Sequence, residues 1–131
     1  MSFESATLPS LVAESELQRE VNHTFSDFGI KGLIGIMKRN RQWEKGEMNM
    51  MVLLKNPTKK ILLLVLHENT EITSHKVNTS ITFHIMEGEL TVHFPDESFN
   101  LKKGERLTRK EKTKFSIDSN KESAFLMTLI S

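Results

Sequence analysis

The feature that most constrains the fold of this chain is a succession of short runs with β-strand patterning, which begins near residue 47 and continues to the last residues. Turn-forming residues such as Pro57, Gly88 and Gly104 separate these runs. Many short strands at regular spacing are typical of an antiparallel sandwich or barrel. The sequence therefore predicts an all-β domain.

The most regular runs lie on either side of Glu87-Gly88. If these two residues form a tight turn, the strands on either side pair symmetrically about it. Each predicted cross-strand pair is apolar, and the pairs are Ile85 with Leu90, Phe83 with Val92 and Ile81 with Phe94. The alternate positions are polar, namely Thr82, His84, Thr91 and His93. This pattern predicts a β-hairpin with one apolar face.

Further strands are expected on both sides of this hairpin. Residues 48–54 and 61–66 are two apolar runs that flank a turn containing Pro57, and they predict another hairpin. Shorter strands are expected at residues 98–101, 106–109, 115–118 and 124–130. Because the runs 48–54 and 61–66 are apolar on both faces, something must cover their outer face. The cover is either an amino-terminal helix or a second copy of the chain.

The amino-terminal part has a different pattern. Leu11, Ala13, Leu17 and Val21 recur at roughly helical spacing and predict a short amphipathic helix. Residues 32–37 are compatible with a strand, and residues 38–45 with a polar connection in which Trp43 is a partly buried anchor over the barrel. We expect one structural domain, in which an extension of residues 1–46 packs on a barrel of residues 47–131.

Composition excludes several classes of function. The chain has 18 Lys plus Arg against 17 Asp plus Glu, so no overall charge attracts it to nucleic acid or to a membrane surface. Cysteine is absent, which excludes disulfides and thiolate chemistry. Glu4 lies where a signal peptide needs positive charge, and the apolar run 61–66 is too short to cross a bilayer. A cytoplasmic protein without a membrane segment is expected.

Several segments in the second part of the chain resemble small single-domain bacterial cupins. They are Leu53-Leu54-Lys55-Asn56-Pro57, residues 61–66, Ser74-His75, Ile85-Met86-Glu87-Gly88-Glu89-Leu90, Leu101-Lys102-Lys103-Gly104-Glu105 and residues 126–130. The match extends from about residue 48 to the end. It implies a cupin-type jelly-roll barrel with a short amino-terminal helical segment, and it favours a homodimer, because small cupins are often dimers. It does not imply one activity, since this fold hosts many.

The same resemblance assigns four metal-ligand positions. Counting from Gly88 and Gly104, the two histidines and the glutamate of the first motif fall on His75, Val77 and Ile81, and the histidine of the second motif falls on Phe115. Valine, isoleucine and phenylalanine have no donor atom, and a catalytic metal needs about three protein ligands. The resemblance therefore implies a largely lost metal site, and we expect no metal or other cofactor.

The remaining candidates each have a structural alternative. The candidate pocket residues are His75, Val77, Ile81, Phe83 and Phe115. His75 is either a ligand-binding imidazole or a hydrogen-bonded core residue. His84 and His93, diagonal on the predicted hairpin, would give with His75 a weak alternative metal site. The competing interpretation is an exposed sheet face or a dimer contact.

Residues 102–114 contain seven basic and two acidic residues. They would attract a phosphate, an acidic partner or nucleic acid, or they form a solvated turn and edge strand. Nucleic acid is disfavoured because only Phe115 adjoins the segment as an aromatic residue for base stacking.

Three functions follow from these patterns. The first is a metal-free cupin-fold module that binds or senses a small molecule. The second is a metal-dependent enzyme with unconventional ligands. The third is a structural or interaction protein with a solid barrel core. No nucleophile elbow, phosphate-binding glycine loop or zinc-spaced histidine motif is present in the sequence, which disfavours an enzyme.

Overall fold

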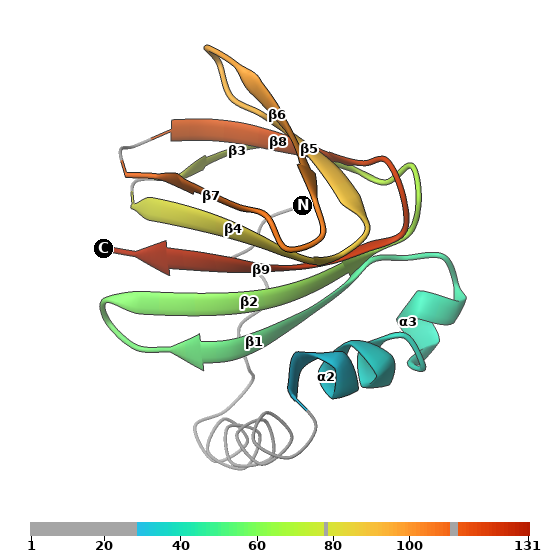
Figure 1. Ribbon diagram of the computed structural model, residues 1–131. Helices are drawn as coiled ribbons and strands as arrows, with labels where there is room; N and C mark the ends of the chain where they lie inside the picture. Colours follow the sequence, from blue (N-terminus) through green and yellow to red (C-terminus); the bar gives the residue numbers. More distant parts are fainter. Residues whose placement is uncertain (1–28, 78, 111–112) are drawn as a thin grey trace.

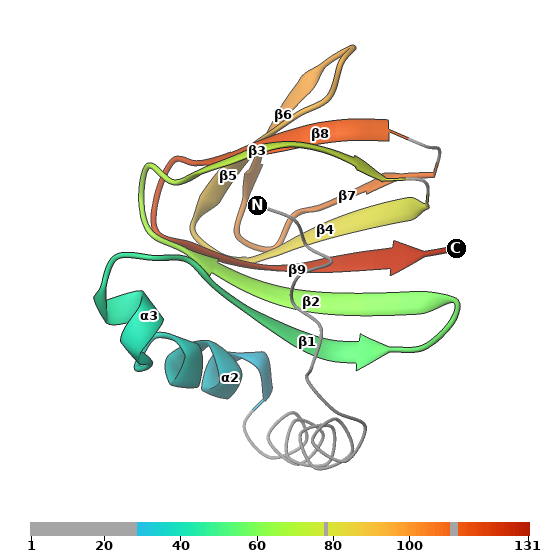
Figure 2. The same ribbon diagram turned by 180° about the vertical axis from the view of Figure 1, so that it is seen from behind.

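Two antiparallel sheets face each other in this computed structural model, and two helices lie against the outside of one of them (Figures 1 and 2). The structure describes residues 29–77, 79–110 and 113–131, with the side chains of Ser74 and His75 excepted. The helix predicted around Leu11 to Val21 lies outside the described residues. The prediction of an all-β domain is confirmed.

The strand order defines the two sheets. Sheet A has the order β1-β2-β9-β4-β7, and sheet B has the order β3-β8-β5-β6. The strands are β1 (Asn49–Lys55), β2 (Lys59–Leu66), β3 (Glu71–Val77), β4 (Ser80–Glu87), β5 (Glu89–His93), β6 (Ser98–Lys102), β7 (Arg106–Arg109), β8 (Thr113–Ser119) and β9 (Ser123–Ile130). Within the described ranges the helices are α2 (Gly29–Met37) and α3 (Arg41–Glu44).

The first predicted hairpin is confirmed, since β1 pairs antiparallel with β2. Its turn is held by the side chain of Asn56, whose Oδ1 accepts hydrogen bonds from the backbone nitrogens of Thr58 at 3.0 Å and Lys59 at 2.8 Å. Asparagine is favoured in such turns because its short side chain can bond to the backbone just beyond it. The strands expected at residues 98–101, 106–109, 115–118 and 124–130 correspond to β6, β7, β8 and β9.

The predicted pairing around Glu87-Gly88 is wrong. Strand β4 pairs with β7 and β9 in sheet A, whereas β5 pairs with β6 and β8 in sheet B. The chain crosses from one sheet to the other at Gly88, which has φ of 84°. A Cβ at this position would collide with the backbone of Glu122 and with Ser123, so glycine is required for conformation and for space.

The predicted inward faces of β4 and β5 are nevertheless correct. Their apolar side chains are buried, but they meet across the space between the sheets instead of side by side in one sheet. This central cluster comprises Val52, Leu62, Leu64, Leu66, Ile72, Ile81, Phe83, Ile85, Leu90, Val92, Phe94, Leu101, Phe115, Ile117, Phe125 and Met127. Phe115 and Ile117 both point inward from β8, as predicted from their alternation.

A second cluster lies on the outer face of sheet A. Residues 32–37 belong to helix α2, so their interpretation as a strand is wrong. Leu33, Ile34 and Met37 recur at helical spacing and pack on outward side chains of β1, β2 and β9, which include Leu53 and Leu63. The described helix thus supplies part of the cover that the two-faced hairpin requires.

Phe115 provides a test of the inward register. Because its side chain is 1% exposed, replacement by alanine should leave a hole between the sheets and cost roughly 3 to 5 kcal/mol of the free energy of unfolding. The neighbouring residue Lys114 is exposed, and Lys114→Ala should change stability by less than about 0.5 kcal/mol. Urea unfolding of both variants measures the difference. Near-neutral behaviour of Phe115→Ala would contradict the register.

Candidate functional site

Three of the four residues assigned to a metal site by resemblance lie in or against the central cluster. Ile81 and Phe115 are 0% and 1% exposed, and Val77 is partly buried against them. The backbone of His75 pairs with that of Phe115, while its side chain lies outside the described part of the structure. Phe83 occupies the middle of the cluster, with its ring centroid 5.4 Å from that of Phe115. Ile81, Phe83 and Phe115 thus belong to one buried cluster, and Val77 packs against it.

The side chains at these positions do not fit a divalent metal. Val77, Ile81 and Phe115 have hydrocarbon side chains without a donor atom. A buried apolar environment strongly disfavours a metal cation whose charge no ligand compensates. Among the residues that the structure describes, no group of three or more His, Asp and Glu side chains is placed to hold a metal ion.

His84 and His93 lie on different sheets, contrary to the arrangement predicted for a metal pair. His84 points outward from β4, where burial and the nearby Arg106 lower its pKa below the usual 6.5. His93 points outward from β5 and hydrogen-bonds Ser98 Oγ and Asp118 Oδ2, each at 2.8 Å. These contacts are cross-strand bonds on the outer face of sheet B.

The outer face of sheet B is polar elsewhere as well. Asn100 donates a hydrogen bond to Glu89 at 3.1 Å, and Asn120 donates to Glu89 at 3.3 Å and to Thr91 at 2.8 Å. Two hydrogen bonds lower the pKa of the Glu89 carboxyl, and the one from Asn100 has the larger effect and the one from Asn120 the smaller. The carboxylate thus has partners within its own sheet.

A cavity of about 300 Å³ opens at the end of the barrel where β2 and β4 begin and β3 and β9 end. We call it the mouth cavity. It is lined by Asn56, Pro57, Lys59, Lys60, Lys76, Val77, Thr79, Leu129 and Ser131. Val77 was predicted as a pocket residue. The other lining residues were missed, because they come from segments far apart in the sequence and form no motif.

Positive charge gathers at the mouth cavity. Lys59, Lys60 and Lys76 line it, and no acidic side chain is among its described lining residues. The strand register adds two further lysines, since Lys55 lies opposite Lys60 and Lys114 lies opposite Lys76. Like charges directly opposite each other in a sheet are destabilising.

The basic segment of residues 102–114 is divided between the two ends of the barrel. Gly104 and Glu105 bond to the backbone of Ile85, near the crossing at Gly88, whereas Lys114 lies at the mouth. Arg109 stacks over Phe94 at 4.2 Å and pairs with Glu97 at 2.6 Å, which links β7 to the β5–β6 turn. Its charge is therefore already compensated by an acidic partner.

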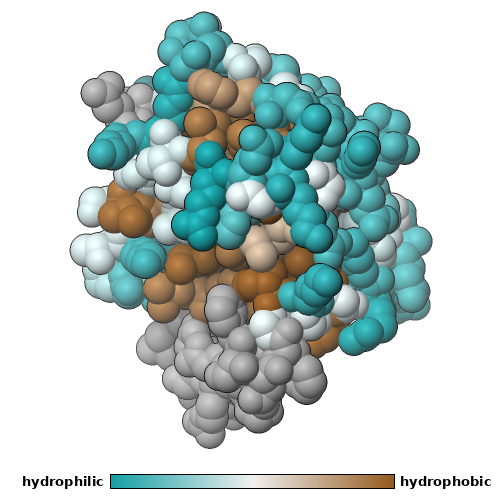
Figure 3. Space-filling model, in the orientation of Figure 1, coloured by the Kyte–Doolittle hydropathy of each residue, from teal (hydrophilic) through white to brown (hydrophobic). Residues whose placement is uncertain are grey.

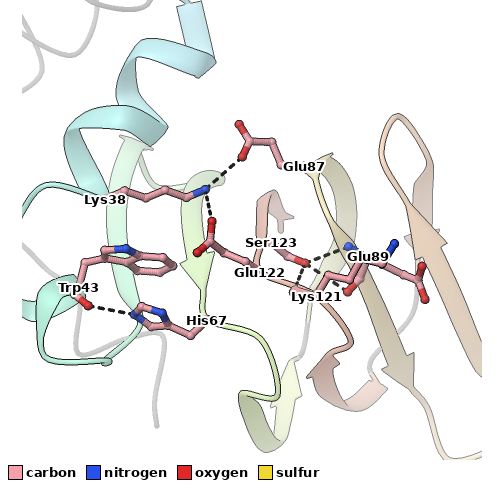
Figure 4. Close-up of polar contacts among 8 residues, drawn as sticks. All are labelled: Lys38, Trp43, His67, Glu87, Glu89, Lys121, Glu122 and Ser123. Atoms are coloured by element: carbon pink, nitrogen blue, oxygen red, sulfur yellow. Dashed lines mark hydrogen bonds and ion pairs between the residues drawn. The ribbon is translucent and has the colours of Figure 1, made fainter.

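Polar contacts lie at the end of the barrel opposite the mouth, and Figure 4 draws them. Ser123 is fully buried beside Gly88, and its Oγ accepts from the backbone nitrogen of Glu89 at 2.9 Å and donates to the carbonyl of Lys121 at 2.7 Å. These bonds fix the crossing between the sheets and leave Ser123 engaged with the backbone.

Trp43 and Lys38 hold the helices at this end of the barrel. Trp43 stacks on His67 with ring centroids 3.5 Å apart, and His67 Nε2 donates to the Trp43 carbonyl at 3.0 Å, as Figure 4 shows. The prediction that Trp43 is a buried anchor is confirmed. Lys38 Nζ contacts Glu87 at 3.2 Å and Glu122 at 2.9 Å. The contacts of Trp43 and Lys38 are explained by their role in holding the helices on the barrel. The mouth cavity is therefore a better candidate for the functional site than this group of residues.

Comparison with known proteins gives the fold a name. No protein-family model and no curated protein matches the chain. Among solved structures, a cupin superfamily protein of Desulfitobacterium hafniense matches with a TM-score of 0.61 and 15% identity over 64% of this chain and 77% of its own. The cupin domain of Cnp3 from Schizosaccharomyces pombe matches with a TM-score of 0.59 and 17% identity over 64% of this chain and 61% of its own.

A salicylate 1,2-dioxygenase variant from Pseudoaminobacter salicylatoxidans also matches, with a TM-score of 0.59 and 16% identity over 68% of this chain and 30% of its own. At such identities the likeness shows the fold alone. The chain has the cupin jelly-roll fold, and the expectation from resemblance is confirmed to that extent. Separately, no helix within the described ranges is long and apolar enough to cross a membrane.

Lys38 gives a test of how the helices are held. Burial alone lowers the pKa of Lys38, but hydrogen bonds and charge attraction from Glu122 and Glu87 outweigh it, so the pKa is raised above 10.5. Lys38→Met should cost roughly 0.5 to 1.5 kcal/mol near neutral pH, a small effect because solvent screens both partly exposed pairs.

The sign of the pH dependence follows from the raised pKa. The stabilisation by Lys38 is fully present below pH 10.5 and is lost as the pH rises through the folded-state pKa. Urea unfolding should therefore show the wild type and Lys38→Met converging at alkaline pH. Lys31→Met, at an exposed position of helix α2, is the control. A constant difference at all pH values would show that Lys38 acts through packing and not through charge.

Proposed function

We propose that this chain is a metal-free small-molecule binding or sensing module whose ligand occupies the mouth cavity. The observation that carries this proposal is a contrast between two places in one barrel. The centre is filled by buried side chains, whereas a cavity of about 300 Å³ is open at the mouth. Small-molecule sites are concave and combine apolar lining with a few polar groups, as Val77 and Leu129 do here with Thr79 and the lysines.

Packing of the centre supports binding at the mouth in preference to the interior. Phe83 contacts the rings of Phe94, Phe115 and Phe125, with centroids between 5.4 and 6.4 Å apart. A ligand placed among these rings would have to displace close-packed side chains, which is costly. The same packing favours a second candidate function, a structural or interaction protein with a solid core.

The metal-free part of the proposal has its own test. Protein purified without chelator should contain well below one equivalent per chain of zinc, iron, manganese, nickel or copper, because three of the four assigned positions carry hydrocarbon. Elemental analysis after dialysis measures this. A stoichiometric metal that survives dialysis would contradict the proposal and support the metal-dependent enzyme instead.

The binding site is tested by NMR mapping with a set of small carboxylic acids, amides and sugars. At least one compound should shift the backbone resonances of Val77, Thr79 and Leu129. The same compound should not bind to the variant Thr79→Trp, because the larger side chain would fill the cavity. Shifts confined to other surfaces, or none, would favour the interaction protein. Mapping the same compounds on Thr91→Trp, a position on the outer face of sheet B, controls for the added indole.

We also propose that the chain forms a homodimer through the outer face of sheet A and helix α2. Hydrophobic residues gather in a band at the level of β9 and β2 (Figure 3). Met51, Ile61, Met86 and Leu126 on this face are only partly buried, and Ile36 on α2 is 44% exposed. A two-fold dimer is the commonest closed assembly, and it would bury this surface.

Light scattering tests the dimer. The chain should run near twice 15.1 kDa, and Ile36→Lys should give the monomer without unfolding it, because the residue lies away from the packed face of α2. Ile130→Lys is the matched control, since Ile130 is 45% exposed but lies at the mouth end of β9. A wild-type monomer at micromolar concentration would contradict the proposal. Leu53 is unsuitable for this test, because it is buried beneath the helices.

A further inference from the structure

We infer that the mouth cavity selects a small organic anion, one with carboxylate or phosphate groups on a short carbon body, and that Lys59 and Lys76 bind its charge. The inference rests on the proposed function, because it names the ligand class of the same cavity. It is carried by the side chains that line the cavity and by the strand register that brings further lysines beside it.

The lining supplies positive charge from two strands. Lys59 is the first residue of β2, and Lys76 is the second-last residue of β3. Both line the cavity, and none of its described lining residues is acidic. Two ammonium groups on separate strands can contact one ligand from two sides, and each has three donors for carboxylate or phosphate oxygens.

The strand register places one of the two proposed binding residues in a like-charge pair. Lys76 faces Lys114 across β3 and β8. Like charges directly opposite each other are unfavourable for the stability of a sheet. Elsewhere in the molecule, basic side chains such as Lys38 and Arg109 lie against carboxylates. A bound anion would supply at the mouth the negative charge that its described lining residues lack.

The size and chemistry of the cavity restrict the anion. About 300 Å³ is at the lower end of the volumes typical of ligand sites, so the ligand is small. Val77 and Leu129 provide an apolar surface for a short carbon chain, and the Thr79 hydroxyl offers a further hydrogen-bonding group. No aromatic side chain is among the described lining residues, so the cavity lacks a stacking platform for nucleic-acid bases. A short dicarboxylate or phosphate ester fits these features better than an oligonucleotide.

The test compares succinate and inorganic phosphate with the uncharged analogue succinamide, by NMR titration of the full chain. Succinate or phosphate should shift the resonances of Val77, Thr79 and Leu129, and binding should weaken as sodium chloride is added, because salt screens exposed charges. The double variant Lys59→Gln, Lys76→Gln should lose roughly five- to tenfold in affinity. The control Lys102→Gln, Lys103→Gln removes the same charge near the crossing at Gly88 and should bind as the wild type does.

A melting curve separates loss of binding from loss of folding. Because Lys76→Gln removes one like-charge pair, this variant should melt at or above the temperature of the wild type in ligand-free buffer. A lower melting temperature would contradict the claim that the lysines are unfavourable for folding.

The outcomes also separate this inference from the proposed function. If succinamide shifts Val77 and Leu129 as strongly as succinate does, the anion inference fails and small-molecule binding at the mouth stands. If no member of the compound set shifts these residues, both fail. If a ten-nucleotide single-stranded DNA displaces both anions from the mouth and binds more tightly than either, the small-anion inference fails in favour of nucleic acid.

Discussion

The interaction on which the rest of the structure depends is the apolar contact between the two sheets around Phe83. This side chain is fully buried, and its ring meets those of Phe115 from sheet B, of Phe94 just after β5, and of Phe125 from its own sheet. Aromatic pairs at these separations stabilise beyond the area that they bury. Strands that are distant in sequence therefore share one core, and the inward direction of each strand is fixed by it.

Because apolar side chains fill the centre of the barrel, polar groups gather at its two ends. The two ends differ in their contacts and in their charge. At one end the chain crosses at Gly88 against Ser123, and the ion pairs of Lys38 hold the helices there. The other end is open and basic. The proposed binding function therefore belongs to the mouth, where a ligand can enter without disturbing the packed rings.

Much of the fold could be predicted from sequence, because alternation of apolar and polar residues determines which side chains point inward. Phe115, Ile117 and the apolar residues of β4 and β5 are buried as their alternation indicates. The pairing of β4 with β5 could not be predicted correctly, because the same alternation fits a hairpin and a crossing between facing sheets. Only the tight contact of Gly88 with Glu122 and Ser123, from a distant strand, distinguishes the two arrangements.

Residues 32–37 were ambiguous for a related reason, since a short apolar run interrupted by glycine does not distinguish a buried helix from a strand. The packing of Leu33 and Met37 on sheet A decides it. The candidate site was the least predictable part. Val77 was found through resemblance, but Lys59 and Lys76 line one cavity only because β2 begins and β3 ends at the same mouth.

The central claim is that the barrel binds a small ligand at its mouth and keeps a packed, metal-free centre. A crystal structure of the full chain grown with succinate and without chelator tests it most directly. The account predicts succinate density against Lys59 and Lys76, with the rings of Phe83 and Phe115 in contact as they are here. Density for a metal or a ligand between those two rings, with the side chains displaced to admit it, would contradict it.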